Sequence, residues 1–227
     1  MQPDNSGLLI VGRGHQWFDD FVRLHLQSPV GQWGFSRRGR TWNRRLGEVI
    51  HVLHIQAGRF GPGISASMGV FVPRIHQFIR AEPPPKFIAQ DLCQLQSALG
   101  HWGSGLRFEP VDPGDPTGKR VHIGQPMVNP DEVVAALLSS AAILDEVRSV
   151  EDVRILLVDL AKQQRWSTGG PSGNRDECLA VLAALSGNAA GARELLLSAL
   201  DNTPPEARTS RGGHYRELAS RLGISLP

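Results

Sequence analysis

The amino-acid sequence predicts an α+β fold, in which an antiparallel β-meander sheet packs against an N-terminal helix and a C-terminal helical region follows. Three runs rich in Val, Ile, Thr and aromatic residues lie between residues 34 and 73, separated by turns that contain glycine. Helical spacing precedes this stretch and returns after residue 128. We therefore expect an α+β sheet domain over residues 1–127 and a helical region of hairpins over residues 128–227, which can pack on the first.

The composition is that of an ordinary globular protein. Of 227 residues, 41% are hydrophobic and 20% are charged, and the formal net charge is only +2, so nothing in the whole chain demands a nucleic-acid partner. The sequence has no run of about 20 apolar residues and no signal-peptide pattern. Its two cysteines lie far apart. We therefore expect a cytoplasmic protein with no membrane contact and with idle thiols.

The N-terminal helix is predicted by apolar and aromatic side chains at helical spacing. These residues are Trp17, Phe18, Phe21, Leu24 and His25. Pro29 and Gly31 are expected to end the helix. Because the meander follows at once, the helix should cover one face of the sheet.

The first predicted strand, within residues 34–45, is polar on both faces and should lie near an edge. Its alternation places Arg38, Arg40, Trp42 and Arg44 on one face, and Arg37, Thr41, Asn43 and Arg45 on the other. The second strand, over residues 49–56, has apolar residues on both faces and should be central. On it, His51 shares a face with Leu53, and His54 takes the opposite face.

The remaining elements follow from local signals. Residues 74–86 are charged and reach three prolines that exclude a helix, the alternation from Cys93 to Leu99 predicts a fourth strand, and residues 121–123 predict a last one. Helix starts are expected at Asn129 and at Ser149. After a flexible break over residues 166–174, the sequence predicts an αα-hairpin around Gly187 and a closing helix that begins before Tyr215.

The local feature that most favours a binding site is a run of basic and aromatic residues over Arg37 to Arg45. Arginine suits phosphate or carboxylate, and a tryptophan beside it can stack on a base. Arg38, Arg40, Trp42 and Arg44 are therefore the candidate ligand-binding or partner-binding residues. The alternative interpretation is structural, with the arginines paired to acids such as Glu48 or Glu82 and the tryptophan packed under a helix.

Catalytic and metal-binding patterns are weak. His51 and His54 face opposite sides of one strand and cannot share an ion. His214 and Glu217 can meet on one helix face, but a catalytic zinc usually needs three protein ligands. Cys93, within an apolar alternation, is expected to be packed rather than nucleophilic. We therefore expect no catalytic residue, no metal site and no cofactor.

The part of the chain that contains the predicted sheet resembles a bacterial family known as domain of unknown function 4304. The residues that carry the resemblance are Gly34-Phe35, the run Arg37–Trp42, Gln56, Gly69-Val70-Phe71 with Pro73, and then Cys93, Leu99-Gly100 and Trp102. It covers about residues 14–125. Ser97-Ala98 stands where members often carry an arginine, and His101-Trp102 where they carry two tryptophans. The resemblance implies the fold but brings no activity, cofactor or catalytic residue.

These observations predict a non-enzymatic protein-binding module with an unknown protein partner. A role in bacterial conflict, immunity or toxin neutralisation is expected only by general analogy with small bacterial domains. The alternative is binding of nucleic acid or a phosphorylated ligand through the basic strand Arg37 to Arg45. A Cys/His enzyme is the third interpretation. Steep salt dependence would distinguish phosphate contacts from an apolar protein interface.

Overall fold

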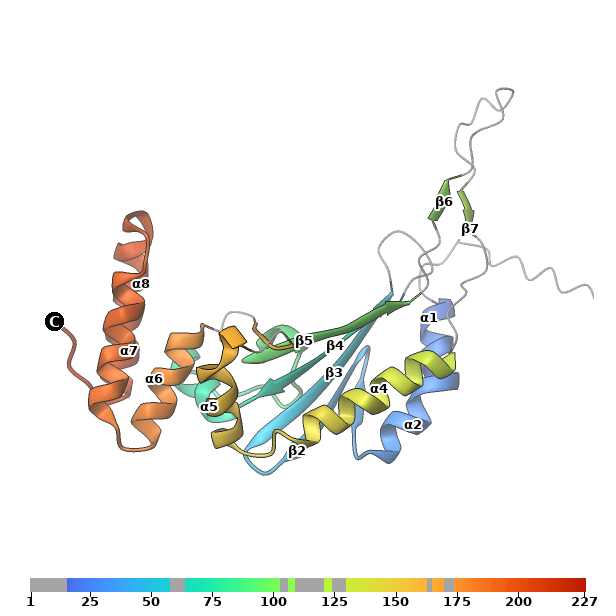
Figure 1. The fold of residues 1–227 in the computed structure, drawn as a ribbon, viewed down its shortest axis with the longest axis horizontal. Coiled ribbons are helices and arrows are strands. Elements are labelled where there is room, and N and C mark those ends of the chain that lie inside the picture. The colour runs from blue at the N-terminus through green and yellow to red at the C-terminus, as the bar shows by residue number, and fades with distance from the viewer. Residues whose placement is uncertain are drawn as a thin grey trace, which may run out of the picture.

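The computed structural model describes residues 16–57, 64–102, 106–108, 121–123, 130–162, 165–169 and 174–227. Its centre is a six-stranded antiparallel sheet in the order β1-β2-β3-β4-β5-β8, seen in Figure 1 with helices beside it and beyond one end. The predicted α+β class is confirmed. The sheet strands are β1 (Ser36–Arg38), β2 (Thr41–Leu46), β3 (Val49–Ala57), β4 (Ile64–Phe71), β5 (Leu95–Trp102) and β8 (Ser167–Thr168), and β6 (Leu106–Phe108) pairs separately with β7 (Val121–Ile123).

The helices frame this sheet. They are α1 (Gln16–Phe21), α2 (Gln27–Gln32), α3 (Pro73–Arg80), α4 (Pro130–Asp145), α5 (Val150–Val158), α6 (Arg175–Leu185), α7 (Ala189–Asp201) and α8 (Arg208–Arg221). A π turn, Val22–Leu26, joins α1 to α2, and short 3₁₀ turns lie at Gln90–Leu92, Leu160–Lys162 and Pro205–Ala207. Within the described ranges, none of the helices combines the length and the apolar character that a membrane crossing requires.

The N-terminal helix ends close to its expected end. Pro29 and Gly31 are expected to close it, and α2 ends at Gln32, one residue after Gly31, with Pro29 inside the helix. The π turn inserts an extra residue per turn, so the buried positions recur every four residues, at Phe18, Val22, Leu26 and Val30. For the same reason Leu24 and His25, expected on the packed face, are exposed.

The first predicted strand is two strands. The chain reverses at Gly39-Arg40, where Gly39 adopts a positive φ of 60° that glycine tolerates, and Arg38 pairs with Thr41. The expectation that Arg38 and Arg40 share one strand face with Trp42 and Arg44 is therefore wrong. Only the last two share a face, on β2.

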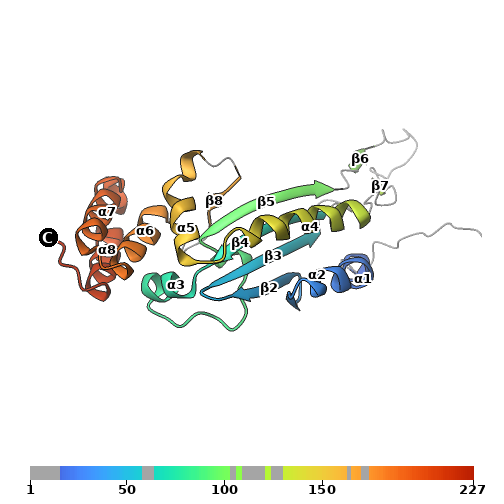
Figure 2. The same cartoon turned by 60° about the horizontal axis from the view of Figure 1, so that its bottom comes forward.

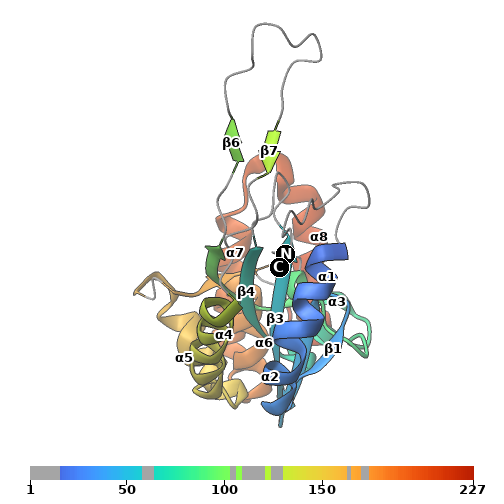
Figure 3. The same cartoon turned by 90° about the vertical axis from the view of Figure 1, so that its right-hand side faces the viewer.

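Different elements cover the two faces of the sheet. On one face α1–α2 lies beside α4, as Figure 3 shows, and Leu53 packs in this larger core. On the other face Val52, Phe71, Ile88 and Cys93 form a smaller cluster. The predicted division of β3 between two apolar faces is confirmed.

The segment Ala81–Cys93 crosses the second face after α3, a helix that the sequence did not indicate. Cys93, expected within a strand, precedes β5 and packs over Gly69, where an added Cβ would lie 2.7 Å from its Sγ. The prediction that Cys93 shares a strand face with Leu95 is wrong, because the chain bends between them.

The helical region completes the sheet. The predicted helix starts are confirmed at Pro130 and at Ser149, which forms a full capping box with Asp152, and so is the αα-hairpin of α6 and α7. The expected cap at Asn129 lies outside the described residues. The stretch expected to be a flexible break contains β8, which pairs with β5. The expected domain boundary at residue 127 lies outside the described residues.

Candidate functional site

Three arginines of the β1–β2 hairpin lie over aromatic rings. Their guanidinium carbons are 5.6 Å from the Trp42 ring for Arg37, 5.0 Å from Phe18 for Arg40 and 4.6 Å from Phe35 for Arg44. Trp42 is only 1% exposed. Contacts of this kind are worth about 0.5–2 kcal/mol each, more where they are desolvated. The basic and aromatic run therefore attaches the hairpin to the N-terminal helix and the core.

Arg44 is the hub of a polar cluster between the sheet and the end of α4. One terminal nitrogen donates to Asp145 at 2.6 Å and to His51 Nδ1 at 3.0 Å, and the other donates to the Trp33 carbonyl at 3.2 Å. Only 13% of its side chain is exposed. His51 Nε2 donates in turn to the Val147 carbonyl at 2.6 Å. The cluster therefore ties β2 and β3 to the segment that follows α4.

The partners of His51 determine its protonation. Arg44 can only donate, so Nδ1 accepts and Nε2 carries the proton that bonds to Val147. Burial lowers the pKa of His51, and the positive charge of Arg44 lowers it further. Both ring nitrogens are thus engaged in the fold, which supports a structural role for this histidine.

The predicted site residues divide into two pairs. Trp42 and Arg44 are held in the packed contacts above, as the structural interpretation expected, although the acid that pairs with Arg44 is Asp145 rather than Glu48 or Glu82. Arg38 is exposed, and Arg40 is half-buried at the hairpin turn. Ligand binding by these residues stays a prediction, and Arg38 and Arg40 are the members that a ligand can reach.

The other titratable candidates are also engaged in the fold. Burial raises the pKa of both Cys93 and Cys178, which disfavours the thiolate that a nucleophile needs. His54 bonds Thr41 Oγ1 at 2.9 Å on the sheet face opposite His51, as the alternation predicted. His214 pairs with Glu177 of α6 at 3.2 Å, and not with Glu217 of its own helix. Among the described residues, no three His, Cys, Asp or Glu side chains gather to hold a metal ion.

Among the described strands, only β8 pairs with the outer side of β5, and it covers part of that side. β8 pairs only with Leu95 and Gln96, and beyond them no strand among the described residues pairs with Ser97–Trp102 on that side. We call this stretch the β5 edge. Gln94–Trp102 contains no charged residue, although charge is a common protection of exposed sheet edges.

The direction of the main-chain groups on the β5 edge follows from β8. The Gly169 N–H donates to the Gln94 carbonyl, and Gln96 lies opposite Ser167. Alternate residues of a strand turn their main-chain groups to the same side, so Ala98 turns its N–H and C=O outward, and Ser97 turns them toward β4. The sequence pattern predicted this strand but did not indicate that it lies near an edge of the sheet.

Comparisons with known proteins add no further information. No family model, no curated protein and no solved structure matches the chain. Membership of the family known as domain of unknown function 4304 therefore stays a prediction, and the contacts described above carry the functional argument.

Proposed function

We propose that this protein is a non-catalytic binding module that holds a segment of a partner protein as an added strand along the β5 edge. The observation that carries the proposal is the stretch Ser97–Trp102, where the pairing with β8 has ended. Such an edge is a ready template for strand addition. Each main-chain hydrogen bond of an added strand contributes about 0.5–1.5 kcal/mol net.

The side chains that could take part in catalysis are buried or hydrogen-bonded within the fold, which supports a non-catalytic role. The two thiols are buried, His51 uses both ring nitrogens in the fold, and Arg44 makes three hydrogen bonds within the protein. A general base or nucleophile must instead reach its substrate. On the outer side of β5, the main chain of Ser97–Trp102 has no strand partner among the described residues, although the Ala98 carbonyl accepts from Ser97 Oγ at 3.4 Å.

Binding of nucleic acid or a phosphorylated ligand remains the alternative proposal. Arg38 is exposed and Arg40 is half-buried at the β1–β2 turn, and Arg45 is exposed at the other end of β2. Phosphate contacts through these side chains would make binding strongly salt-dependent. The experiment below therefore includes an arm for this alternative.

The test is capture of partners from an extract of the source cells, run in parallel with and without nuclease, by tagged full-length protein and its variants. Ala98→Pro removes the outward N–H of the β5 edge without touching the pairing with β4, and Ala98→Thr is the matched control that keeps it. We expect a nuclease-resistant protein partner that Ala98→Pro loses and both Ala98→Thr and Arg40→Glu retain. Equal capture by Ala98→Pro would overturn strand addition. Nucleic acid that only Arg40→Glu loses would establish the alternative.

A further inference from the structure

The helix α4 runs beside β5 on the first face of the sheet, as Figure 2 shows. Its rotation is set by Asp145, which bonds Arg44 on β2. Residues of a helix advance by about 100° each, so the flank opposite to Asp145 carries Ala136 and Ile143. Because β2 and β5 lie on opposite sides of β3 and β4, this flank faces the β5 edge. We call it the α4 flank.

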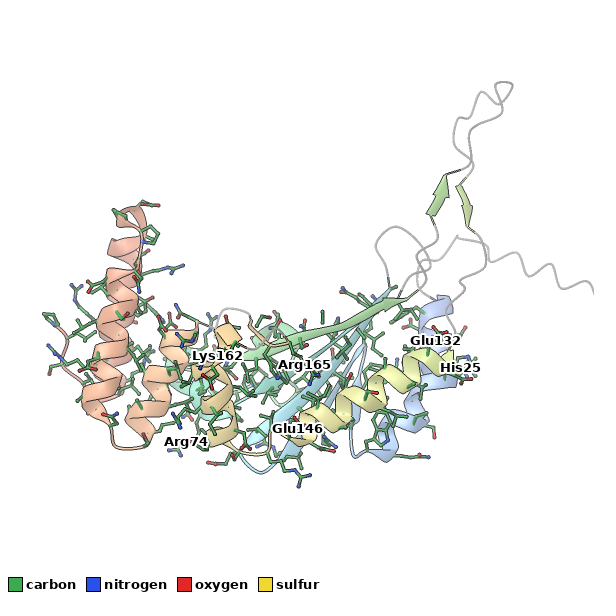
Figure 4. All side chains as sticks on the ribbon, viewed as in Figure 1. His25, Arg74, Glu132, Glu146, Lys162 and Arg165 are labelled. Atoms are coloured by element: carbon green, nitrogen blue, oxygen red, sulfur yellow. The ribbon has the colours of Figure 1, made fainter. Side chains whose placement is uncertain are left out.

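Between Ala136 and Ile143 the α4 flank is uncharged and partly open, whereas Glu132, one turn before Ala136 on the same side of the helix, is charged. Ala136 and Ile143 are both half-buried, and Ser140 between them is 2% exposed. From Val133 to Leu144 the helix has no charged residue, and Figure 4 shows Glu132 near its start and Glu146 just past its end. A strand added to the β5 edge would turn every second side chain toward this flank.

The opposite face of the same strand has a different character. Gln96 and Ala98 turn away from α4, and Ala98 is exposed. Side chains of an added strand on this side would meet a polar residue, a small residue and water. The two sides of the β5 edge therefore favour different side chains.

From this arrangement we infer that the partner segment is extended and uncharged at alternate positions, with small or β-branched apolar side chains toward the α4 flank and polar ones on the other side. The inference rests on the proposed function and names the chemistry of its ligand. A charged side chain at the first set of positions would lose water against Ala136 and Ile143 without gaining a partner.

A second copy of this chain fits the β5 edge less well. Ala66 pairs with Gly100 and Ser67 with Ala98, so Leu99 is the extra residue of a β-bulge. In an antiparallel pair of two β5 strands centred on Leu99, the bulges would face each other. Gln96 of one copy would then face Trp102 of the other, but β8 already occupies that place. A separate segment meets neither obstacle.

Three synthetic peptides test the inference with the full-length protein labelled with ¹⁵N. The first is acetyl-Lys-Thr-Val-Thr-Val-Thr-Lys-amide, the second has Glu for both Val, and the third is the first with N-methyl groups on its central amides. We expect the valine peptide to shift the β5 amides and to slow hydrogen exchange at Ala98. It should bind at least about tenfold more tightly than the glutamate peptide, and the N-methylated copy should not bind.

Protein variants and outcomes complete the test. Ala98→Thr should bind the valine peptide, and Ala98→Pro should not. Equal binding of the valine and glutamate peptides would overturn the side-chain preference while leaving strand addition in place. Absence of any shift with all three peptides would also overturn the inference, and the capture experiment then decides the proposed function separately. A concentration-dependent dimer with Ala98 protected would assign the edge to a second copy.

Discussion

The close packing of Cys93 over β4 leaves no room for a side chain at Gly69. An added Cβ there would lie 2.7 Å from Cys93 Sγ and 3.0 Å from the Leu95 carbonyl, closer than packed atoms tolerate. We expect Gly69→Ala to lower the free energy of unfolding by about 2 kcal/mol, measured by urea denaturation. Gly31→Ala is the control, since no atom lies within 4 Å of its added Cβ, and it should be neutral or slightly stabilising. Equal effects would contradict the packing of Cys93 over β4.

Buried histidines make stability depend on pH. Burial lowers the pKa of His51, His54 and His76, so the unfolded chain binds protons that the folded chain does not. Their contribution is complete above the unfolded pKa of about 6.5 and is lost as pH falls through the folded values. We expect the free energy of unfolding to fall between about pH 7.5 and about pH 5.5, and to fall less in His51→Gln. An unchanged pH dependence in that variant would argue against a neutral, buried His51.

At this scale the sequence predicted partners poorly. The structural interpretation paired the arginines of the run with acids such as Glu48 or Glu82 and packed Trp42 under a helix, but it could not name Asp145, which lies far along the chain. It also indicated that Cys93 would be packed, which its burial confirms. The face on which Cys93 packs depends on a bend that has no local signature.

Asn43 controls an element rather than a single contact. Its side-chain amide donates to the Ile88 carbonyl at 3.0 Å and accepts from the Ile88 N–H at 2.6 Å, which holds the segment Ala81–Cys93 over the sheet. Asn43→Ala leaves both buried groups unpaired, so we expect a loss of about 3 kcal/mol in the free energy of unfolding. Faster hydrogen exchange at the Ile88 amide should accompany it. Arg45→Ala, an exposed neighbour on the same face of β2, should change stability by less than about 0.5 kcal/mol, and a comparable loss there would contradict this account.

Elements with local signals were predicted well. The capping box at Ser149, the proline near the start of α4 and the turn at Gly47, whose φ is +54°, each depend on residues only a few positions apart in the sequence. The break at Gly39 was missed, because arginine and threonine alternation continues through it. The π turn was missed as well, because it shifts the period of the buried face without changing the residue types.

The whole molecule is assembled from contacts that cross the predicted boundary. α4 packs on the sheet and β8 joins it, so the helical region supplies both the last strand and the α4 flank. The sequence predicted the class and the order of most elements. It could not predict the β5 edge, because the place of a strand in a sheet depends on pairing between distant residues such as Gln96 and Ser167.

The measurement that tests the central claim most directly is amide hydrogen exchange of the free, full-length protein along β5. Ser97 turns its N–H toward β4 and should be protected, whereas the outward N–H of Ala98 should exchange at least about a hundredfold faster. The same measurement at two protein concentrations detects pairing between copies. Protection of Ala98 equal to that of Ser97 in the monomer would show that the edge is already covered within the chain, and would contradict its role as the binding site.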